Sequence, residues 1–390
     1  MIKKLSLVFF AACFIVSCTL NQLTRQEGGP APGEEPAPRP DYLTLVAAGD
    51  NLFHAPMIRP DPKTGLYDFT ASYAEIKALV EPADIAFINQ ETVFGGAASG
   101  FSGYPRFNTP AEVGAALAGA GFDVINHATN HIMDKGEGAV FATMNYWDTV
   151  PGVQYLGIYR SPEERETKKV IIEKNNISAG FLAYTYGTNG LPVPRDKPYL
   201  VSLINETMME KEIAALRPLC DFLVVSMHWG EEYRHTATGE QKRLARFLAN
   251  QGVDLILGHH PHVIEPYEYL DRPDGGKTLC FYSLGNFLSA QQSGATQLGV
   301  LAYIRIKKLH QELNIDAAGV IPVVNHYEPG FTVFRVYPLY NYHETLAEKH
   351  LLRLRGQQIT VPFFTNLAAD IFTGGNILSA NPFEKGEENP

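Results

Sequence analysis

Short apolar runs, almost uninterrupted by polar residues, recur along the chain between Tyr42 and Tyr337. Runs of this length predict strands that are covered on both faces, as parallel strands are in α/β folds. The strands predicted in this way are Leu43–Ala48, Ile85–Asn89, Val124–Asn126, Phe222–Met227, Leu255–Leu257 and Leu279–Ser283. Amphipathic segments at helical spacing lie between them, so the sequence predicts an α/β domain.

Two of these amphipathic segments carry recognisable helix boundaries. The first begins with Thr109 as an N-cap and Pro110 at the first helical position, and it ends at Gly121. The second ends at Gly252, because glycine readily adopts the left-handed conformation that terminates helices. We therefore expect one helix before each of these glycines.

From Gly299 onward, strand-like runs follow one another without intervening helices. They predict an antiparallel extension of the sheet and comprise Val300–Ile306, Leu313–Ile315, Val320–Val324 and Phe331–Val336. A helix is expected over His343–Arg355. The sequence thus predicts one folded domain over residues 42–337, followed by a C-terminal helix and tail over 338–390.

The first 41 residues have a different character. A positive start and an apolar run from Leu5 to Val16 are typical of an export signal, because the run is too short for a comfortable transmembrane helix. It ends at Ser17-Cys18, which resembles a bacterial lipobox and predicts a lipoprotein signal over residues 1–18, with lipid on Cys18. An ordinary export signal with an incidental Cys18 is the alternative. Residues 19–41 are rich in Pro and Gly and predict a disordered tether, so we expect an extracytoplasmic, membrane-anchored domain.

Composition excludes some classes of protein. Charged residues make up 19% of the 390 residues and the net charge is −10, with no long basic run, which argues against binding to nucleic acid. A local basic pocket for an anionic substrate stays compatible with this total. Cys220 and Cys280 lie in or beside apolar runs and are expected to be buried thiols, although a disulfide between them stays open.

Metal-binding side chains follow five of the predicted strands. They are Asp50, Glu91, Asn130-His131, His228 and the pair His260 and His262. Because ligand crevices of open α/β sheets lie outside the carboxyl ends of the strands, we expect these residues to meet in one cleft. Each one alone could be a turn, a cap or a core residue, but the whole set favours a metal site. Such oxygen and nitrogen ligands suit one or two ions of Mn, Fe or Zn.

Other residues are candidates for catalysis. Of the adjacent Asn130 and His131, one is expected to ligate a metal while the other, or Asp134, orients the substrate. Glu231 or Glu232 is a candidate general acid or base, the other being a loop or surface carboxylate.

Three residues are candidates for substrate binding. Arg106 and Arg234 could each bind a carboxylate or phosphate in bidentate fashion, or be ordinary surface arginines. Asn286 is either a wall of the site or a turn residue. His259, between the metal-capable segments, is expected to point away and bond to loop backbone.

Six motifs occur in a characteristic order. They are Gly49-Asp50, Asn89–Thr92, Thr129–Gly136, His228–Tyr233, Gly258–His262 and Tyr282–Phe287. In order and spacing they resemble the CapA family of capsule-synthesis proteins over Thr44–Phe287. The resemblance implies a four-layer α/β/β/α fold similar to calcineurin-like metallophosphoesterases. It also implies a role in making, attaching or exporting poly-γ-glutamate or a related anionic polymer, with membrane synthase subunits as candidate partners.

The chain departs from the metallophosphoesterase pattern in two places. Leu52 stands where the first motif, Asp-x-His, has its histidine, and the second motif, Gly-Asp-x-x-Asp, is replaced around Asn89 and Glu91. One metal ion, or an altered pair bridged by Glu91, would fit, and His54 is a candidate replacement ligand. Three hypotheses follow: a metal-dependent hydrolase or transferase acting on the polymer, a non-catalytic polymer-binding or scaffold subunit, and a phosphoesterase unrelated to polyglutamate.

Overall fold

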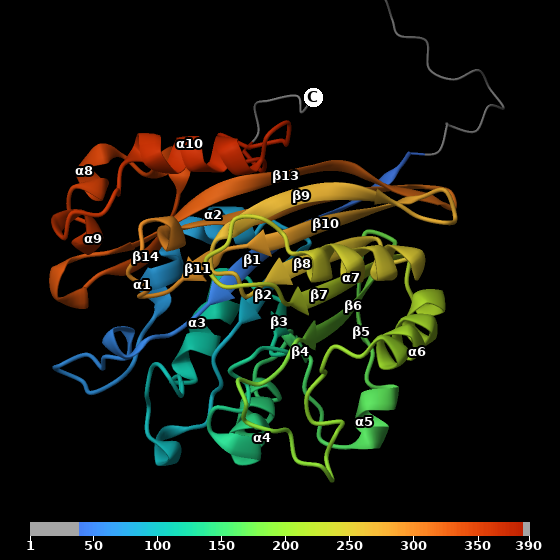
Figure 1. Ribbon diagram of the computed structural model, residues 1–390, viewed down its shortest axis with the longest axis horizontal. Coiled ribbons are helices and arrows are strands. Elements are labelled where there is room, and N and C mark those ends of the chain that lie inside the picture. The colour runs from blue at the N-terminus through green and yellow to red at the C-terminus, as the bar shows by residue number, and fades with distance from the viewer. Residues whose placement is uncertain (1–38, 385–390) are drawn as a thin grey trace, which may run out of the picture. The chain divides into compact units, whose positions relative to one another are not determined.

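A computed structural model describes residues 39–384. The predicted signal over 1–18, with Cys18, and most of the predicted tether over 19–41 lie outside the described residues. From Pro40 onward the chain forms one compact unit (Figure 1). Within residues 39–384, no helix is both long and apolar enough to cross a membrane.

The first sheet contains eight strands in the order β14-β13-β12-β1-β2-β3-β4, with β11 paired to β1. Strands β1 to β4 are parallel, whereas β12, β13 and β14 continue the sheet in antiparallel fashion, which confirms the predicted extension. The strands are β1 Asp41–Asn51, β2 Ile85–Gln90, β3 Val124–Asn126, β4 Gln154–Leu156, β11 Asn286–Leu288, β12 Leu298–Leu309, β13 Glu312–Tyr327 and β14 Phe334–Pro338.

The second sheet contains six strands in the order β5-β6-β7-β8-β10-β9. Strands β6, β7, β8 and β10 are parallel, and the edge strands β5 and β9 are antiparallel to their neighbours. The strands are β5 Val170–Lys174, β6 Ile177–Thr185, β7 Phe222–His228, β8 Leu255–His259, β9 Ile264–Asp271 and β10 Lys277–Leu284. All six strands predicted before Gly299 are present in the two sheets.

The two sheets face each other across one apolar core, and helices cover their outer faces. Leu45 and Val224 point into the core between the sheets, whereas their neighbours Val46 and Val225 point outward. Helices α1–α4 pack on the outer face of the first sheet, and α6 and α7 pack on the second (Figure 1). This confirms the predicted four-layer α/β/β/α arrangement. The helices are α1 Thr70–Tyr73, α2 Lys77–Val80, α3 Glu112–Ala120, α4 Gly136–Trp147, α5 Pro162–Thr167, α6 Glu206–Leu216 and α7 Gly239–Asn250.

Helix α3 begins later than the sequence predicts. Its first residue is Glu112 and Ala111 occupies the N-cap, so the expected cap at Thr109 is wrong. The hydroxyl of Thr109 donates instead to that of Thr92 at 2.7 Å. Gly121 ends the helix with φ of 104°, which confirms the predicted stop.

The C-terminal segment differs from its prediction in two respects. The expected helix over His343–Arg355 is divided into α8 (Glu344–Ala347) and α9 (Leu351–Leu354), because His350 caps α9 by accepting a hydrogen bond from Leu352 N. A third helix, α10 (Val361–Ile371), was not predicted. Apolar side chains of this segment join the core between the sheets, including Leu352, Phe364 and Ala368.

Three predicted C-terminal strands also change. Leu313–Ile315 and Val320–Val324 belong to the single long strand β13. The strand predicted from Phe331 begins at Phe334 instead, because Phe331 lies at the end of a short 3-10 helix and has φ of 54°. Cys220 and Cys280 are both free thiols, the first half-buried and the second buried.

Candidate metal centre

The carboxyl ends of the central strands in both sheets carry the candidate ligands. In the first sheet Asp50 of β1 is in register with Asn89 of β2 and Asn286 of β11. In the second sheet His228 of β7 is in register with His259 of β8. The loop after β8 then carries His260 and His262 to the same place. The predicted convergence of distant strand ends is therefore seen in the structure.

Asp50 organises the first-sheet side of the cluster. Its Oδ1 accepts a hydrogen bond from Asn89 Nδ2 at 2.8 Å, and its Oδ2 lies 3.2 Å from the backbone N of His260 and 3.0 Å from Nδ1 of His262. Burial alone would raise the pKa of Asp50, but the hydrogen bond and charge of His262 and the charge of His259 outweigh it and lower that pKa. Asp50 is thus held as a carboxylate at the junction of the sheets.

Glu91 is fully buried, and within residues 39–384 neither of its carboxylate oxygens has a hydrogen-bond partner. Its Oε1 lies 3.7 Å from Nε2 of His228 and 3.7 Å from Nε2 of His262, too far for hydrogen bonds. Burial raises the pKa of Glu91 well above its usual value, and His262 opposes this. A buried carboxylate without partners is costly, and a bound cation would remove that cost.

Three groups of side chains bring ligand atoms within 4.8 Å of one another. They are Glu91 with His228 and His260, Asp50 with Glu91 and His262, and Glu232 with His260 and His262. Glu91 belongs to two groups, so a single carboxylate can serve two neighbouring positions. The donor set of imidazole nitrogens and carboxylate oxygens fits divalent transition metals. The residues present therefore fit one or two such ions.

The protonation of the imidazoles also suits metal binding. Burial, together with the charges of neighbouring histidines, lowers the pKa of His228 well below its usual value and that of His260 to about 3. Both rings are thus neutral near pH 7, as a ligating imidazole must be. Burial also disfavours the charge on His262, but Glu91 and Asp50 outweigh it and raise its pKa to about 9. The two carboxylates beside His262 thus favour a positive charge at this position.

Asn130, His131 and Asp134 form the next layer around the cluster. Asn130 Oδ1 lies 2.9 Å from Nε2 of His228, so Asn130 contacts a metal-capable side chain directly. Nδ1 of His131 lies 2.8 Å from Oδ2 of Asp134, which also accepts a hydrogen bond from Phe107 N at 2.7 Å. Among the described residues, His131 is in none of the three ligand groups. The structure thus places His131 beside the cluster, paired with Asp134.

A cleft of about 680 Å³ opens over the cluster. Its lining includes His54, Arg106, His131, Asp134, Glu232 and His262. Arg106 is exposed and lies in this lining. Asn286 sits behind His262, with its Oδ1 3.2 Å from Nδ1 of that ring, and its Nδ2 donates to Gln291. Asn286 therefore supports the wall of the site.

Glu231 and Arg234 lie apart from this cleft. They pair with each other at 2.8 Å on the surface, and in the described part of the chain neither lines the cleft. Glu232 faces it instead, because the backbone turns at Tyr233, which has φ of 64°. Leu52 is buried, and His54 lines the cleft with its Nδ1 3.1 Å from the carbonyl oxygen of Leu52. None of the three ligand groups within residues 39–384 contains His54.

For two residues of the cluster, the sequence predicted the wrong direction (His259) or no role in the site (Asn89). His259 does not point away: its Nδ1 lies 3.6 Å from Oδ1 of Asp50, and within the described residues neither ring nitrogen has a hydrogen-bond partner. Asn89 donates to Asp50 and accepts a hydrogen bond from Asn126 Nδ2 at 2.7 Å. Asn89 lies at the end of a predicted strand, two residues before Glu91, and this position could have indicated that it belongs to the site.

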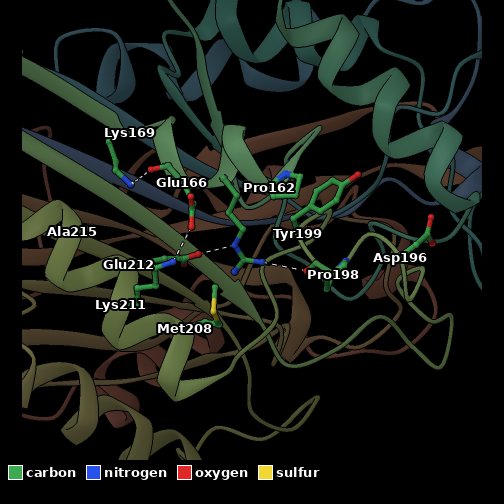
Figure 2. Close-up of a pocket in the computed structure, with 11 residues that line it drawn as sticks. Pro162, Glu166, Lys169, Asp196, Pro198, Tyr199, Met208, Lys211, Glu212 and Ala215 are labelled. Carbon is green, nitrogen blue, oxygen red and sulfur yellow. Dashed lines mark hydrogen bonds and ion pairs between the residues drawn. The ribbon is translucent and has the colours of Figure 1, made fainter.

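A larger cavity of about 720 Å³ lies between α5 and α6 (Figure 2). Four of its charged side chains pair with one another: Arg165 pairs with Glu212 at 2.7 Å, and Lys211 pairs with Glu166 at 2.9 Å. None of the three ligand groups in residues 39–384 lies there. The candidate metal centre is therefore the cleft at the strand ends.

Residues 44–291 match the family described as bacterial capsule synthesis protein PGA_cap. The chain belongs to the PGA_cap family. The matched range contains every candidate ligand of the metal centre. The chain is 30% identical over 204 residues to the PGA biosynthesis protein CapA of Bacillus subtilis, and the aligned region covers 52% of each chain. It is 29% identical over 185 residues to the capsule biosynthesis protein CapA of Bacillus anthracis, covering 46% of this chain and 43% of that one. This PGA_cap chain thus spans about half the length of the curated relatives it matches.

Solved structures show more distant likenesses to this PGA_cap chain. NAD nucleotidase of Haemophilus influenzae is 10% identical, with a TM-score of 0.44, over 85% of this chain and 60% of that one. The calcineurin-like phosphoesterase YfkN of Bacillus subtilis is 15% identical, with a TM-score of 0.41, over 84% of this chain and 100% of that one. Neither likeness assigns an activity.

Proposed function

We propose that the chain is a metal-dependent hydrolase or transferase that acts on poly-γ-glutamate, a related anionic surface polymer, or its precursor. Membership of a capsule-synthesis family supports the polymer. The observation that carries the chemical part is the buried Glu91 carboxylate, which is ringed by imidazoles and lacks a hydrogen-bond partner within residues 39–384.

The ligand groups divide into two neighbouring positions. Glu91, His228 and His260 would hold one ion, and Asp50, Glu91 and His262 would hold another, with Glu91 shared. A divalent ion bound there would polarise a carbonyl or phosphoryl oxygen or lower the pKa of a water molecule. The nitrogen and oxygen donors are compatible with Mn, Fe or Zn as the metal.

Side chains around the cluster would handle the substrate. Asp134 holds His131 through Nδ1, which leaves Nε2 to exchange a proton with a group bound in the cleft. Arg106, exposed on the cleft wall, would bind a carboxylate of the polymer. Glu232 rather than Glu231 is the carboxylate in position to act as a general acid or base, because it lines the cleft.

We further propose that the mature protein is extracytoplasmic and is held on a membrane by lipid on Cys18. The support comes from the sequence alone, namely the apolar run that ends at Ser17-Cys18. In cells, Cys18→Ser should move the protein from the membrane fraction to the soluble fraction. Retention of the variant in the membrane fraction would overturn the anchor.

A non-catalytic polymer-binding or scaffold subunit is the second candidate. The buried Leu52, at the place of a metal-binding histidine in metallophosphoesterases, favours it. Metal-loaded protein should be assayed for turnover of γ-glutamyl peptides and of a phosphodiester, with Glu91→Gln as the inactive control. Turnover of the peptides alone supports the proposal, and turnover of the phosphodiester alone assigns another substrate class. No turnover of either, together with copurification with membrane synthase subunits, would favour the scaffold.

A further inference from the structure

A smaller cleft of about 380 Å³ opens off the metal-bearing cleft. Its lining residues are Arg106, Met133, Asp134, Lys135, Gly136, Leu191 and Pro192. We call this the side cleft. It shares Arg106, Asp134 and Leu191 with the metal-bearing cleft, so the two clefts adjoin at these residues.

The side cleft carries two cations that are free to bind an anion. Within residues 39–384, neither Arg106 nor Lys135 forms an ion pair with a carboxylate. Glu137, two residues after Lys135, is occupied by Lys197 at 2.6 Å.

Asp134 is the one carboxylate in the lining of the side cleft, and it faces inward. It is buried, and its Oδ2 accepts a hydrogen bond from Phe107 N and lies 2.8 Å from Nδ1 of His131. Its charge is therefore turned toward the protein, whereas Arg106 is exposed and Lys135 is half-buried. The open side of the cleft presents positive charge.

We propose that the side cleft binds further carboxylates of an anionic polymer whose reacting unit lies at the metal centre. The inference rests on the proposed function and adds a subsite to it. A substrate that ended at the metal centre would leave Lys135 unused, whereas a chain with one carboxylate per residue can reach Arg106 and then Lys135. The subsite thus makes the protein selective for long chains.

Chain-length dependence of binding tests the subsite. Metal-loaded protein is titrated with γ-linked glutamate oligomers of two and eight residues, in wild type and in Lys135→Gln. Loss of one charge-assisted contact should weaken binding of the octamer about tenfold and leave the dimer unchanged. Lys135→Arg should restore most of the octamer affinity. Added salt should weaken binding of the octamer more than that of the dimer.

Lys242→Gln is the matched control, because Lys242 is exposed on α7 and, in the described part of the chain, forms no ion pair. Thermal melts of both variants check that they fold as wild type does. The subsite is overturned if Lys135→Gln and Lys242→Gln bind the octamer with the same affinity. It is also overturned if Lys135→Gln weakens binding of the dimer and of the octamer equally. Inorganic phosphate that binds wild type more tightly than Lys135→Gln, while the octamer binds the two alike, would assign the side cleft to a free anion and also overturn the subsite.

The subsite and the proposed enzyme can fail separately. If the octamer binds through Lys135 but metal-loaded wild type turns over no oligomer, the subsite stands and the hydrolase or transferase falls. If oligomers are turned over and Lys135→Gln has wild-type affinity and chain-length preference, the enzyme stands and the subsite falls.

Discussion

Nδ1 of His262 lies 3.0 Å from Oδ2 of Asp50, although 212 residues separate the two in sequence. Asp50 is the penultimate residue of β1 in the first sheet, and His262 lies in the loop after β8 of the second. The contact therefore joins the carboxyl edges of both sheets. The metal centre is built across this junction, so it depends on how the two sheets pack as well as on its ligands.

Glu91→Gln should separate stability from metal binding. Without metal, the amide replaces a buried carboxyl group that has no hydrogen-bond partner within residues 39–384 and whose charge is disfavoured by burial, so the melting temperature should rise or stay unchanged. With metal, loss of a charged ligand should weaken binding by about 1.5–3 kcal/mol, roughly 10- to 150-fold. Thermal melts with chelator and with added metal measure both effects. A Glu91→Gln protein that is less stable without metal would contradict this account of Glu91.

Glu232→Gln and Glu231→Gln form a matched pair of neighbouring variants. Glu232 lines the cleft and has a ligand atom within 4.8 Å of those of His260 and His262, whereas Glu231 pairs with Arg234 on the surface. Glu232→Gln should lower turnover of γ-glutamyl peptides at least tenfold, and Glu231→Gln should stay within about twofold. If a steady-state assay shows the larger loss of turnover for Glu231→Gln, the loop that carries Glu231 and Glu232 has a different orientation in solution.

Gly258 should tolerate no side chain. A Cβ added there would lie 1.9 Å from the carbonyl oxygen of Tyr282 in the adjacent strand, just before the ligand loop. Gly258→Ala should therefore destabilise the protein by more than about 3 kcal/mol. Gly239→Ala is the control, because a Cβ at this position of α7 meets nothing within 4 Å, and it should be neutral or stabilise by up to about 1 kcal/mol. Urea denaturation of both variants checks the contrast, and similar losses would count against the close approach of the two strands.

Stability at acid pH should depend on His127. Its Nε2 accepts a hydrogen bond from Trp147 Nε1 at 2.7 Å, and burial lowers the pKa of His127 to about 3. Because the unfolded chain binds the proton with a pKa near 6.5, His127 contributes stability above that pH that is lost as pH falls toward 3.

Metal-free wild type and His127→Gln should be compared by urea denaturation at pH 7.5 and pH 4.5. Between pH 7.5 and pH 4.5, the free energy of unfolding of wild type should fall by about 2–3 kcal/mol more than that of the variant. Equal losses would mean that His127 is not held neutral in the folded protein.

The meeting of the site residues could be predicted from sequence, but the direction of each side chain could not. Asp50, His228 and His262 follow buried parallel strands, whose carboxyl ends share an edge. His259 was expected to point away, but β8 extends to this residue and directs its ring against Phe87, with ring centroids 5.9 Å apart. The directions of His260 and His262 depend on positive φ angles of 97° and 60°, which no local residue pattern indicates.

The fold was predictable where strands are buried on both faces and less so at the edges. The edge strands β5 and β9 carry exposed polar residues and lack a continuous apolar run. Strand β6 is buried but contains Gly180, which permits close approach to Cys220 and weakens the strand signal in the sequence. The packing of α10 on the core likewise depends on contacts distant in sequence.

The metal content of the purified protein tests the central claim most directly. After incubation with excess Mn, Fe or Zn and removal of unbound metal, elemental analysis of wild type should give one or two ions per chain. His262→Ala should bind less, while His54→Ala should bind as wild type does, because His54 lies outside the ligand groups found in residues 39–384. Wild-type protein that is folded yet retains no stoichiometric metal would contradict the account.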